Sequence, residues 1–134
     1  MKYRVQNPSQ TQQIAAELAR RLRGGEVIWM EGDLGAGKTT FVKGLAAALG
    51  VEEVVTSPTF TFLRSYRGRA LTLHHFDLYR AQDADELYEL GLAEYLGESD
   101  AVCVIEWNKL ESPVEPIRVR IRVVGDTERE IEIV

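Results

Sequence analysis

Hydrophobic positions near the start of the chain follow a helical spacing. Ile14, Leu18 and Leu22 recur every four residues, which places them on one face of a helix. A capping-box signature at Ser9 marks the expected beginning of this helix. Two glycines at 24–25 are a typical helix stop. The pattern therefore predicts an amphipathic first helix.

The next segment reads as a strand, a glycine-rich loop and a second helix. Residues 27–30 form an uninterrupted apolar run, which is typical of a buried strand. After the loop at 32–37, apolar residues return at helical spacing until Gly50 ends the pattern. These apolar positions are Val42, Leu45, Ala46 and Leu49.

The middle of the chain predicts a hairpin, a short acidic helix and a third buried strand. Residues 59–66 and 71–77 are strand-like and flank a turn at 67–70. Residues 85–95 have a helical pattern interrupted by a glycine. Residues 101–107 form an apolar run of the fully buried type.

Charged and aliphatic residues alternate along the last part of the chain and predict a second hairpin. With a turn at 125–127, Arg122 lies opposite Glu130 and Arg120 opposite Glu132. Aliphatic residues then pair on the other face. A row of arginines is also a potential contact for phosphate or RNA. The cross-strand match to glutamates favours a solvated, charge-paired face instead.

The loop after the first strand carries the most specific chemical signal. Residues 32–39 match the phosphate-binding pattern Gly-x4-Gly-Lys-Thr, and they lie between a predicted strand and a predicted helix, as the motif requires. Backbone N–H groups of such a loop and the helix N-terminus bind an anion. We expect Lys38 to reach the β- and γ-phosphates, Thr39 to ligate Mg²⁺ and Thr40 to approach the α-phosphate. A plain strand-to-helix connection is the alternative, but the flanking elements, the lysine and the threonine together favour the P-loop.

Hydrolysis also needs a carboxylate near the phosphates, and two predicted strands end in one. Glu106 follows the longer and more uniform apolar run, so we expect its strand to be central and adjacent to the P-loop strand. Asp77 ends the other strand, and we expect it either to help Glu106 hold the Mg²⁺ ion or to orient the nucleophile. His75 points to the same face as Asp77 by strand periodicity. A satisfied core or interface histidine is an equal alternative for His75.

Two further blocks are candidates for nucleotide-dependent switching. Ser57, Pro58 and Thr59 follow the P-loop helix in a predicted loop, where hydroxyls can sense Mg²⁺ or the γ-phosphate. An ordinary Ser-Pro turn is the alternative. Tyr79 and Arg80 come directly after Asp77. Arg80 is a candidate for neutralising developing charge, with a surface salt bridge to the following acidic segment as an equal alternative.

Composition is consistent with a single globular domain spanning residues 1–134. Apolar residues make up 45% and charged residues 28% of the chain, which is ordinary for a globular protein. No apolar run is long enough for a transmembrane span, and the first residues lack a signal-peptide core. The net charge of −5 argues against strong autonomous nucleic-acid binding. The single cysteine, Cys103, is expected to be a buried strand thiol, and we expect a cytoplasmic protein with no membrane association.

Four blocks together resemble the TsaE (YjeE) family of P-loop ATPases of bacterial tRNA threonylcarbamoyladenosine biosynthesis. Their order and spacing are similar over nearly the whole chain. The blocks are Gly-Asp-Leu-Gly-Ala-Gly-Lys-Thr-Thr at 32–40, Ser-Pro-Thr-Phe-Thr at 57–61, His-Phe-Asp-Leu-Tyr-Arg at 75–80 and Glu-Trp at 106–107.

The resemblance implies a fold, an activity and partners. The fold is a P-loop NTPase-like α/β three-layer sandwich around a mixed central β-sheet. The activity is weak, Mg²⁺-dependent ATP hydrolysis. The partners are two proteins of the TsaB and TsaD type, which with this ATPase modify an adenosine in tRNAs that read codons beginning with A. The threonylcarbamoyl transfer itself belongs to a partner, so contact with tRNA is indirect.

The resemblance also implies roles for individual residues. Thr39 and Glu106 hold Mg²⁺, Thr11 lies near the base, and Trp107 sits over the site. Where the family commonly has proline after Glu-Trp, this chain has Asn108, so we expect a less rigid loop there. The expected nucleotide contacts are Thr11, Asp33, Leu34, Gly35, Ala36, Gly37, Lys38, Thr39 and Thr40. The expected catalytic residues are Lys38, Asp77 and Glu106, and the expected switch residues are Ser57, Pro58, Thr59, His75, Tyr79, Arg80 and Trp107.

Three other function classes remain to be weighed. A small-molecule kinase needs an acceptor-binding region and a lid, for which the chain has little room. A nucleotide-gated binding module differs from a partner-dependent ATPase only in whether its function requires ATP turnover. A GTPase is disfavoured because the base-reading pattern Asn-Lys-x-Asp is missing; Asn108-Lys109 is followed by Leu-Glu.

Overall fold

A computed structural model describes residues 1–33, 35–58 and 61–134. Its elements, in chain order, are β1 (Lys2–Val5), α1 (Pro8–Ala19), β2 (Val27–Glu31), α2 (Lys38–Ala48), β3 (Leu63–Arg67), β4 (Thr72–Asp77), α3 (Ala84–Glu89), the 3-10 helix η1 (Leu92–Tyr95), β5 (Ala101–Glu106), β6 (Ile117–Val123) and β7 (Arg129–Ile133). No helix among these residues is both long and apolar enough to cross a membrane.

The strands form one seven-stranded mixed sheet in the order β1-β7-β6-β2-β5-β4-β3. The four inner strands β6, β2, β5 and β4 run parallel, and the three outer pairs, β1–β7, β7–β6 and β4–β3, are antiparallel. The P-loop strand β2 is therefore central, with β5 directly beside it, which confirms the predicted neighbour. Parallel strands carry their carboxyl ends to one edge of the sheet, which is where ligands bind in such folds.

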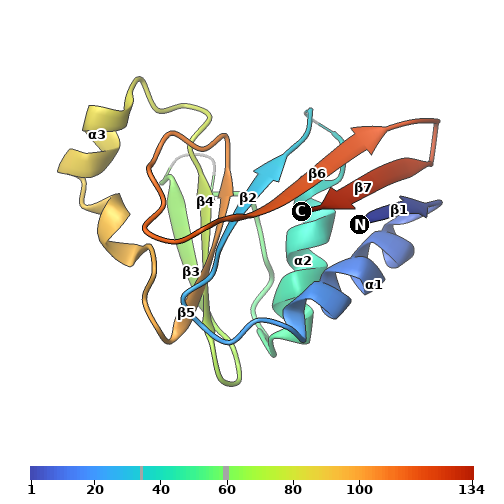
Figure 1. Cartoon of the computed structure of the whole chain (residues 1–134), viewed down its shortest axis with the longest axis horizontal. Helices are drawn as coiled ribbons and strands as arrows, with labels where there is room; N and C mark the ends of the chain where they lie inside the picture. The colour runs from blue at the N-terminus through green and yellow to red at the C-terminus, as the bar shows by residue number, and fades with distance from the viewer. Residues whose placement is uncertain (34, 59–60) are drawn as a thin grey trace.

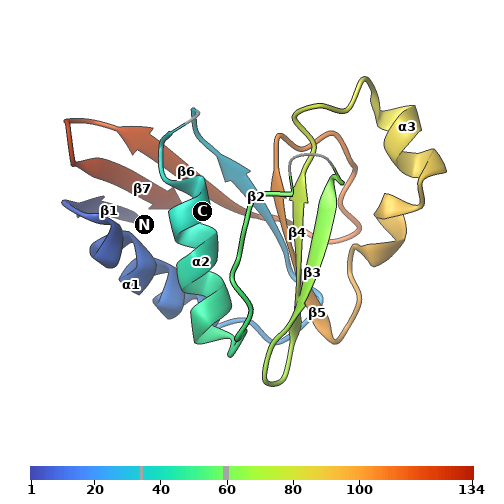
Figure 2. The ribbon, with the colours of Figure 1, turned by 180° about the vertical axis from the view of Figure 1, so that it is seen from behind.

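Helices cover the two faces of the sheet unequally (Figure 1). Alternate residues of β2 point to opposite faces, so Ile28 and Met30 join one core with α1 and α2. Val27 joins a second, smaller core with residues of α3 and η1, and half-buried Trp29 packs against it. Seen from behind, α2 lies across the sheet beside α1, while α3 lies at the far end (Figure 2). The predicted α/β fold around a mixed sheet is confirmed.

The first helix begins earlier than the capping box at Ser9 predicted. Asn7 is the N-cap, and its side chain accepts a hydrogen bond from the Gln10 backbone N–H at 2.9 Å. Pro8 occupies the first turn, where its missing N–H costs nothing and its fixed φ suits a helix. An asparagine cap followed by proline therefore determines where the helix begins, and Ser9 lies inside it.

Close approach of the two long helices depends on Gly44 in α2. A Cβ atom at this position would lie 2.6 Å from the Cα atom of Gln12 in α1, a distance that side chains do not tolerate. The absence of a side chain at Gly44 lets α1 and α2 pack backbone to backbone. This packing fixes α2, whose first residue is Lys38, against the sheet.

The C-terminal hairpin has the predicted register. Arg120 pairs with Glu132, Ile121 with Ile131 and Arg122 with Glu130. Arg122 donates a hydrogen bond to Glu130, and this bond lowers the pKa of the Glu130 carboxyl. The strand β1, which the hydrophobic pattern did not predict, adds to this hairpin by pairing with β7. Four residues are too few for a strand signal, so the partner strand determines its conformation.

The hairpin of β3 and β4 and the break at Gly91 also match the predictions. Strand β3 begins at Leu63, and residues 59–60 of the predicted strand lie outside the described part of the chain. Gly91 has a left-handed backbone (φ 78°) and separates α3 from η1. Cys103 is buried, as expected, and burial followed by the nearby Glu98 charge raises its pKa to about 12. The thiol is therefore protonated and no nucleophile.

Candidate phosphate-binding site

The glycine-rich loop lies between the end of β2 and the start of α2. Gly37 is the N-cap of α2, has a left-handed backbone (φ 109°) and receives no side-chain cap. The first backbone N–H groups of α2 therefore have no side-chain partner from the cap and are available to an anion. Asp33 and Gly35 are exposed, while Thr39 and Thr40 are half-buried in the first turn. Leu34 lies outside the described residues.

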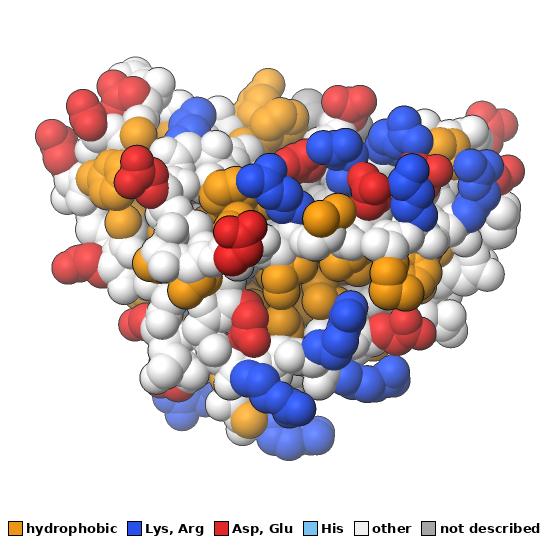
Figure 3. Space-filling model, viewed as in Figure 1, with side chains coloured by type: hydrophobic (Ala, Val, Ile, Leu, Met, Phe, Trp, Pro, Cys, Tyr) orange, Lys and Arg blue, Asp and Glu red, His pale blue; other side chains and the backbone are white. Residues whose placement is uncertain are grey.

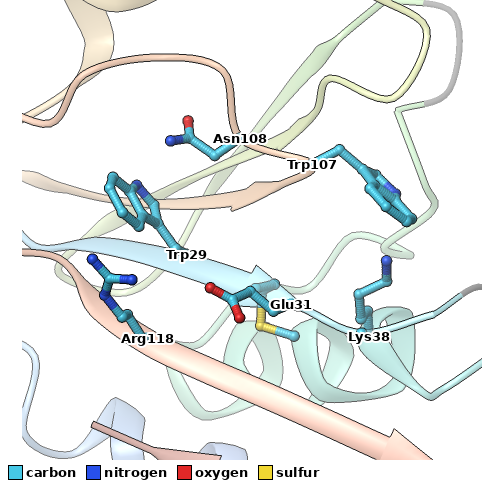
Figure 4. Close-up of a pocket in the computed structure, with 8 residues that line it drawn as sticks. Trp29, Glu31, Lys38, Trp107, Asn108 and Arg118 are labelled. Carbon is cyan, nitrogen blue, oxygen red and sulfur yellow. The ribbon is translucent and has the colours of Figure 1, made fainter.

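Lys38 is buried at the start of α2, with 6% of its surface exposed. Its Nζ lies 3.9 Å from Oε1 of Glu106 and 4.1 Å from the centre of the Trp107 ring. Figure 4 shows the ammonium group directed toward the Trp107 ring. The cationic group expected to bind phosphate is thus held by a carboxylate and an aromatic face.

Glu106 ends β5 and is held from its other side by His75 of β4. The His75 Nε2 atom lies 2.6 Å from Oε2 of Glu106, and both side chains are buried. Within the described residues, Nδ1 of His75 has no hydrogen-bond partner. A carboxylate only accepts hydrogen bonds, so we assign the proton to Nε2, the ring nitrogen that faces Glu106. His75 then donates to Oε2 and leaves Oε1 of Glu106 facing Lys38.

Asp77 lies directly opposite Glu106 at the carboxyl ends of β4 and β5. Its Oδ2 accepts a hydrogen bond from the Ser57 hydroxyl at 3.2 Å, and its Oδ1 accepts one from the Tyr79 backbone N–H at 3.1 Å. The structure therefore brings together both candidate carboxylates and connects Asp77 to the predicted switch segment. Pro58 beside Ser57 is buried, and Thr59 lies outside the described residues.

Trp107 lies at the turn that follows β5. Its backbone is left-handed (φ 56°), which is uncommon for a residue with a large side chain. The Tyr79 ring packs against its ring at 5.0 Å between centroids, and Lys38 lies on the ring as described. Tyr79 is 56% exposed, and the adjacent Arg80 is also exposed. These contacts place Trp107 and Tyr79 at the mouth of the site.

Side-chain hydrogen bonds, rather than a proline, constrain the loop after Trp107. Asn108 exchanges two hydrogen bonds with the backbone of Leu110, at 2.8 and 3.0 Å. Lys109 Nζ donates to the carbonyls of Leu78 and Ala81, which ties this loop to the segment around Tyr79. Asn108 and Lys109 thus have structural partners, and the loop is more constrained than the missing proline suggested.

A cavity of about 320 Å³ lies between the glycine-rich loop, the start of α1 and the turn of the C-terminal hairpin. Thr11, which is buried in α1, lines it together with Gly35 and Thr40. Asn7, Asp126 and Arg129 also line it and were not predicted.

Arg129 supports the loop from this side. Its Nε donates to the Ala36 carbonyl at 3.1 Å, and its Nη1 donates to the carbonyls of Gly125 and Glu128. No sequence signal distinguishes Arg129 from the other charged residues of the hairpin.

A second cavity of about 320 Å³ opens beside Lys38 on the other face of the sheet (Figure 4). Trp29 and Arg118 form one side of it, and Trp107 and Lys38 the other. The Arg118 guanidinium lies 4.9 Å from the Trp29 ring centre. Sequence reasoning missed this pair because its members come from different strands.

The donor chemistry of the site fits Mg²⁺. Carboxylate oxygen of Glu106 and hydroxyl oxygen of Thr39 are the hard ligands that this ion prefers. Within the described ranges, no group of three or more His, Cys, Asp and Glu side chains is arranged to hold a metal. Mg²⁺ is commonly held by one or two protein ligands together with water and phosphate oxygens, so an incomplete protein shell is expected.

Comparison with known proteins identifies the family. The family model described as "Threonylcarbamoyl adenosine biosynthesis protein TsaE" matches residues 5–131. The TsaE protein of Bacillus subtilis is 45% identical over 98% of this chain and 83% of its own length. TsaE of Treponema pallidum is 44% identical over 87% of each chain. The crystal structure of Bacillus subtilis YdiB is similar with a TM-score of 0.78 and 39% identity, over 99% of this chain and 83% of that one. The chain therefore belongs to the TsaE family of tRNA threonylcarbamoyladenosine biosynthesis proteins.

Proposed function

We propose that the protein is the ATP-binding and ATP-hydrolysing component of the cytoplasmic machinery that forms threonylcarbamoyladenosine in tRNA. Hydrolysis is Mg²⁺-dependent, slow in the isolated protein and stimulated by two partner proteins of the TsaB and TsaD type. Contact with tRNA is made through that complex. The observation that carries the proposal is the P-loop between β2 and α2, with Lys38 and Glu106 facing each other at 3.9 Å.

Binding of ATP requires Lys38 to change partners. Before binding, its ammonium group faces the Glu106 carboxylate and the Trp107 ring. The phosphates are a stronger partner, because they carry more charge and lie at the N-terminus of α2. Moving Lys38 to the β- and γ-phosphates releases Oε1 of Glu106 for the metal. The same loop residues, from Asp33 to Thr40, supply the backbone contacts.

Glu106 and Thr39 would hold Mg²⁺, which would supply positive charge to offset the charge of the phosphates. His75 donates to Oε2 of Glu106, while Oε1 faces Lys38, so Oε1 is the oxygen that we expect to be offered to the metal. Asp77 orients the attacking water, and its bond with Ser57 transmits the state of the site to the switch segment. Trp107 and Tyr79 limit access of solvent to Lys38.

The isolated protein is expected to turn over slowly for a physical reason. The one histidine near the carboxylates, His75, is fully buried and engaged with Glu106, so it is not available as a base toward water. Ser57 and Tyr79 lie on an exposed surface, where a partner can order them.

Calorimetric titration of the protein with ATP and GTP tests nucleotide choice, and the same titration together with a phosphate-release assay, with and without Mg²⁺, tests metal dependence. We expect ATP to bind more tightly than GTP, and Mg²⁺ to be required for phosphate release but not for binding. Tight GTP binding with no ATP binding would contradict the proposal. So would phosphate release that persists in the presence of a chelator.

A further inference from the structure

Among the described residues, no helix covers the face of β6 and β2 that points away from α1 and α2, and this face carries a paired tryptophan and arginine. Trp29 and Arg118 are directly opposite each other in the parallel ladder of β2 and β6. Figure 3 shows Lys and Arg side chains along this face, interleaved with Asp and Glu side chains. The cavity of about 320 Å³ leads from this pair to Lys38 and Trp107.

Arg118 differs from the other two arginines of its strand. Arg120 forms ion pairs with Glu31 and Glu132, and Arg122 pairs with Glu130. In the part of the chain that the structure describes, no carboxylate lies within ion-pair distance of Arg118, and its guanidinium lies over the Trp29 ring. Stacking uses the flat face of a guanidinium group and leaves N–H donors on its edge available for a planar carboxylate.

The residues around this cavity are of the kind that dominate protein interfaces. Trp29, Trp107, exposed Tyr79 and Arg118 are tryptophan, tyrosine and arginine residues, which are enriched among residues that carry binding energy. A guanidinium already ordered by stacking loses little side-chain freedom when a partner binds. The neighbouring arginines are neutralised by glutamates, so this face is not the basic stripe that RNA binding requires.

We propose that Trp29 and Arg118 form a docking anchor for an acidic side chain of a partner protein, which enters the cavity beside Lys38. The carboxylate pairs with the Arg118 guanidinium while apolar parts of the partner segment contact the two tryptophan rings. This inference rests on the proposed function, since the partner is the two-protein complex of the TsaB and TsaD type. It adds that the contact is made on the sheet face next to the phosphate site.

The test measures the affinity of the chain for the purified partner pair by biolayer interferometry. Arg118→Glu should weaken binding by roughly 30-fold or more, as expected for an interface anchor. Arg118→Lys should weaken binding to the partner pair by several-fold, because lysine keeps the charge but lacks the planar, forked guanidinium group. Arg67→Glu is the matched control, since it makes the same charge change at an exposed residue of β3, at the opposite edge of the sheet. Thermal unfolding of all three variants checks that a loss of affinity does not come from loss of the fold.

Several results would overturn the inference. Equal binding by the parent and Arg118→Glu would do so, as would equal losses in Arg118→Glu and Arg67→Glu, which would indicate a general charge effect. Weaker binding of tRNA alone by Arg118→Glu, with unchanged partner affinity, would indicate a phosphate contact instead. If the parent chain does not bind the partner pair at all, the proposed function itself is wrong in its partners, and the docking anchor is wrong with it.

Discussion

His75 Nε2 lies 2.6 Å from Oε2 of Glu106, in a fully buried contact between neighbouring strands. The bond fixes the rotamer of Glu106 and determines which oxygen faces Lys38. His75 is therefore a positioning residue, because it acts on the nucleotide site only through Glu106. His75 is thus a buried histidine with a carboxylate partner, and its role in the nucleotide site stays a prediction.

The geometry of this bond makes a residue-specific prediction. The side-chain nitrogen of Gln reaches the position of Nε2, whereas that of Asn reaches the position of Nδ1. We expect His75→Gln to keep Mg²⁺-dependent turnover within several-fold, and His75→Asn to lose roughly 10- to 100-fold, as for other residues that orient a metal ligand. Nitrogen-detected NMR of the ligand-free protein should show the proton on Nε2. Equal loss in the Gln and Asn variants, or a proton on Nδ1, would contradict the assignment.

Lys38→Ala should nearly abolish ATP turnover, by roughly 10²-fold or more, because it removes the main cationic contact to the transferred phosphate. The fold should survive, since Lys38 lies at the beginning of α2 and outside the hydrophobic cores. Lys43→Ala, an exposed lysine of the same helix, serves as the control and should keep parental turnover. Phosphate release and thermal unfolding are measured on all three proteins. If Lys38→Ala hydrolysed ATP at the parental rate, the assignment of residues 32–39 as a P-loop would be wrong.

Substitutions of Glu106 and of Asp77 should affect different properties of ATP hydrolysis. Glu106→Ala should lower Mg²⁺-dependent hydrolysis more than ATP affinity, because the loop and α2 bind the phosphates without it. Asp77→Asn should lower turnover while leaving the Mg²⁺ requirement unchanged. Titration with Mg²⁺ at saturating ATP distinguishes the two. A crystal structure with nucleotide and Mg²⁺ that places Asp77, and not Glu106, beside the metal would reverse the roles.

Stability should fall at high pH because of Cys103. Burial raises the pKa of the Cys103 thiol to about 12 in the folded protein, from an ordinary value of 9.0. A raised pKa means that the folded state holds the proton more tightly, so the contribution is complete below about pH 9 and is lost as the pH rises toward 12. We expect the difference in unfolding free energy between the parent and Cys103→Ala to shrink by up to about 1.4 kcal/mol per pH unit in this window. Urea unfolding at several pH values measures it, and a constant difference would contradict the shift.

Local sequence patterns predicted most of the fold. The strand–loop–helix around the P-loop, the central place of the Glu106 strand and the register of Arg120 with Glu132 all follow from periodicity and from charge pairing across a turn. These features depend on residues close together in the chain or on a single turn. The predicted start of α1 at Ser9 was wrong, because an Asn7 cap followed by Pro8 begins a helix more favourably than the capping box at Ser9.

Contacts between distant segments were not predictable in the same way. Three contacts join strands or loops that meet only in the folded sheet. They are the hydrogen bond from His75 to Glu106, the hydrogen bond from Arg129 to the Ala36 carbonyl, and the contact of Arg118 with the Trp29 ring. Period-2 alternation places His75 on a face but not beside a particular partner. Assigning such partners requires the order and register of the strands, which a single sequence does not contain.

Steady-state phosphate release, measured with the protein alone and then with the partner pair and tRNA, tests the central claim most directly. We expect slow hydrolysis alone and a large increase with the partners, with an upper bound of roughly 10³- to 10⁵-fold by analogy with activation of P-loop enzymes in trans. The increase should disappear in Lys38→Ala. A negligible change on adding the partners, together with fast phosphate transfer to a small acceptor, would contradict the account and identify a kinase instead.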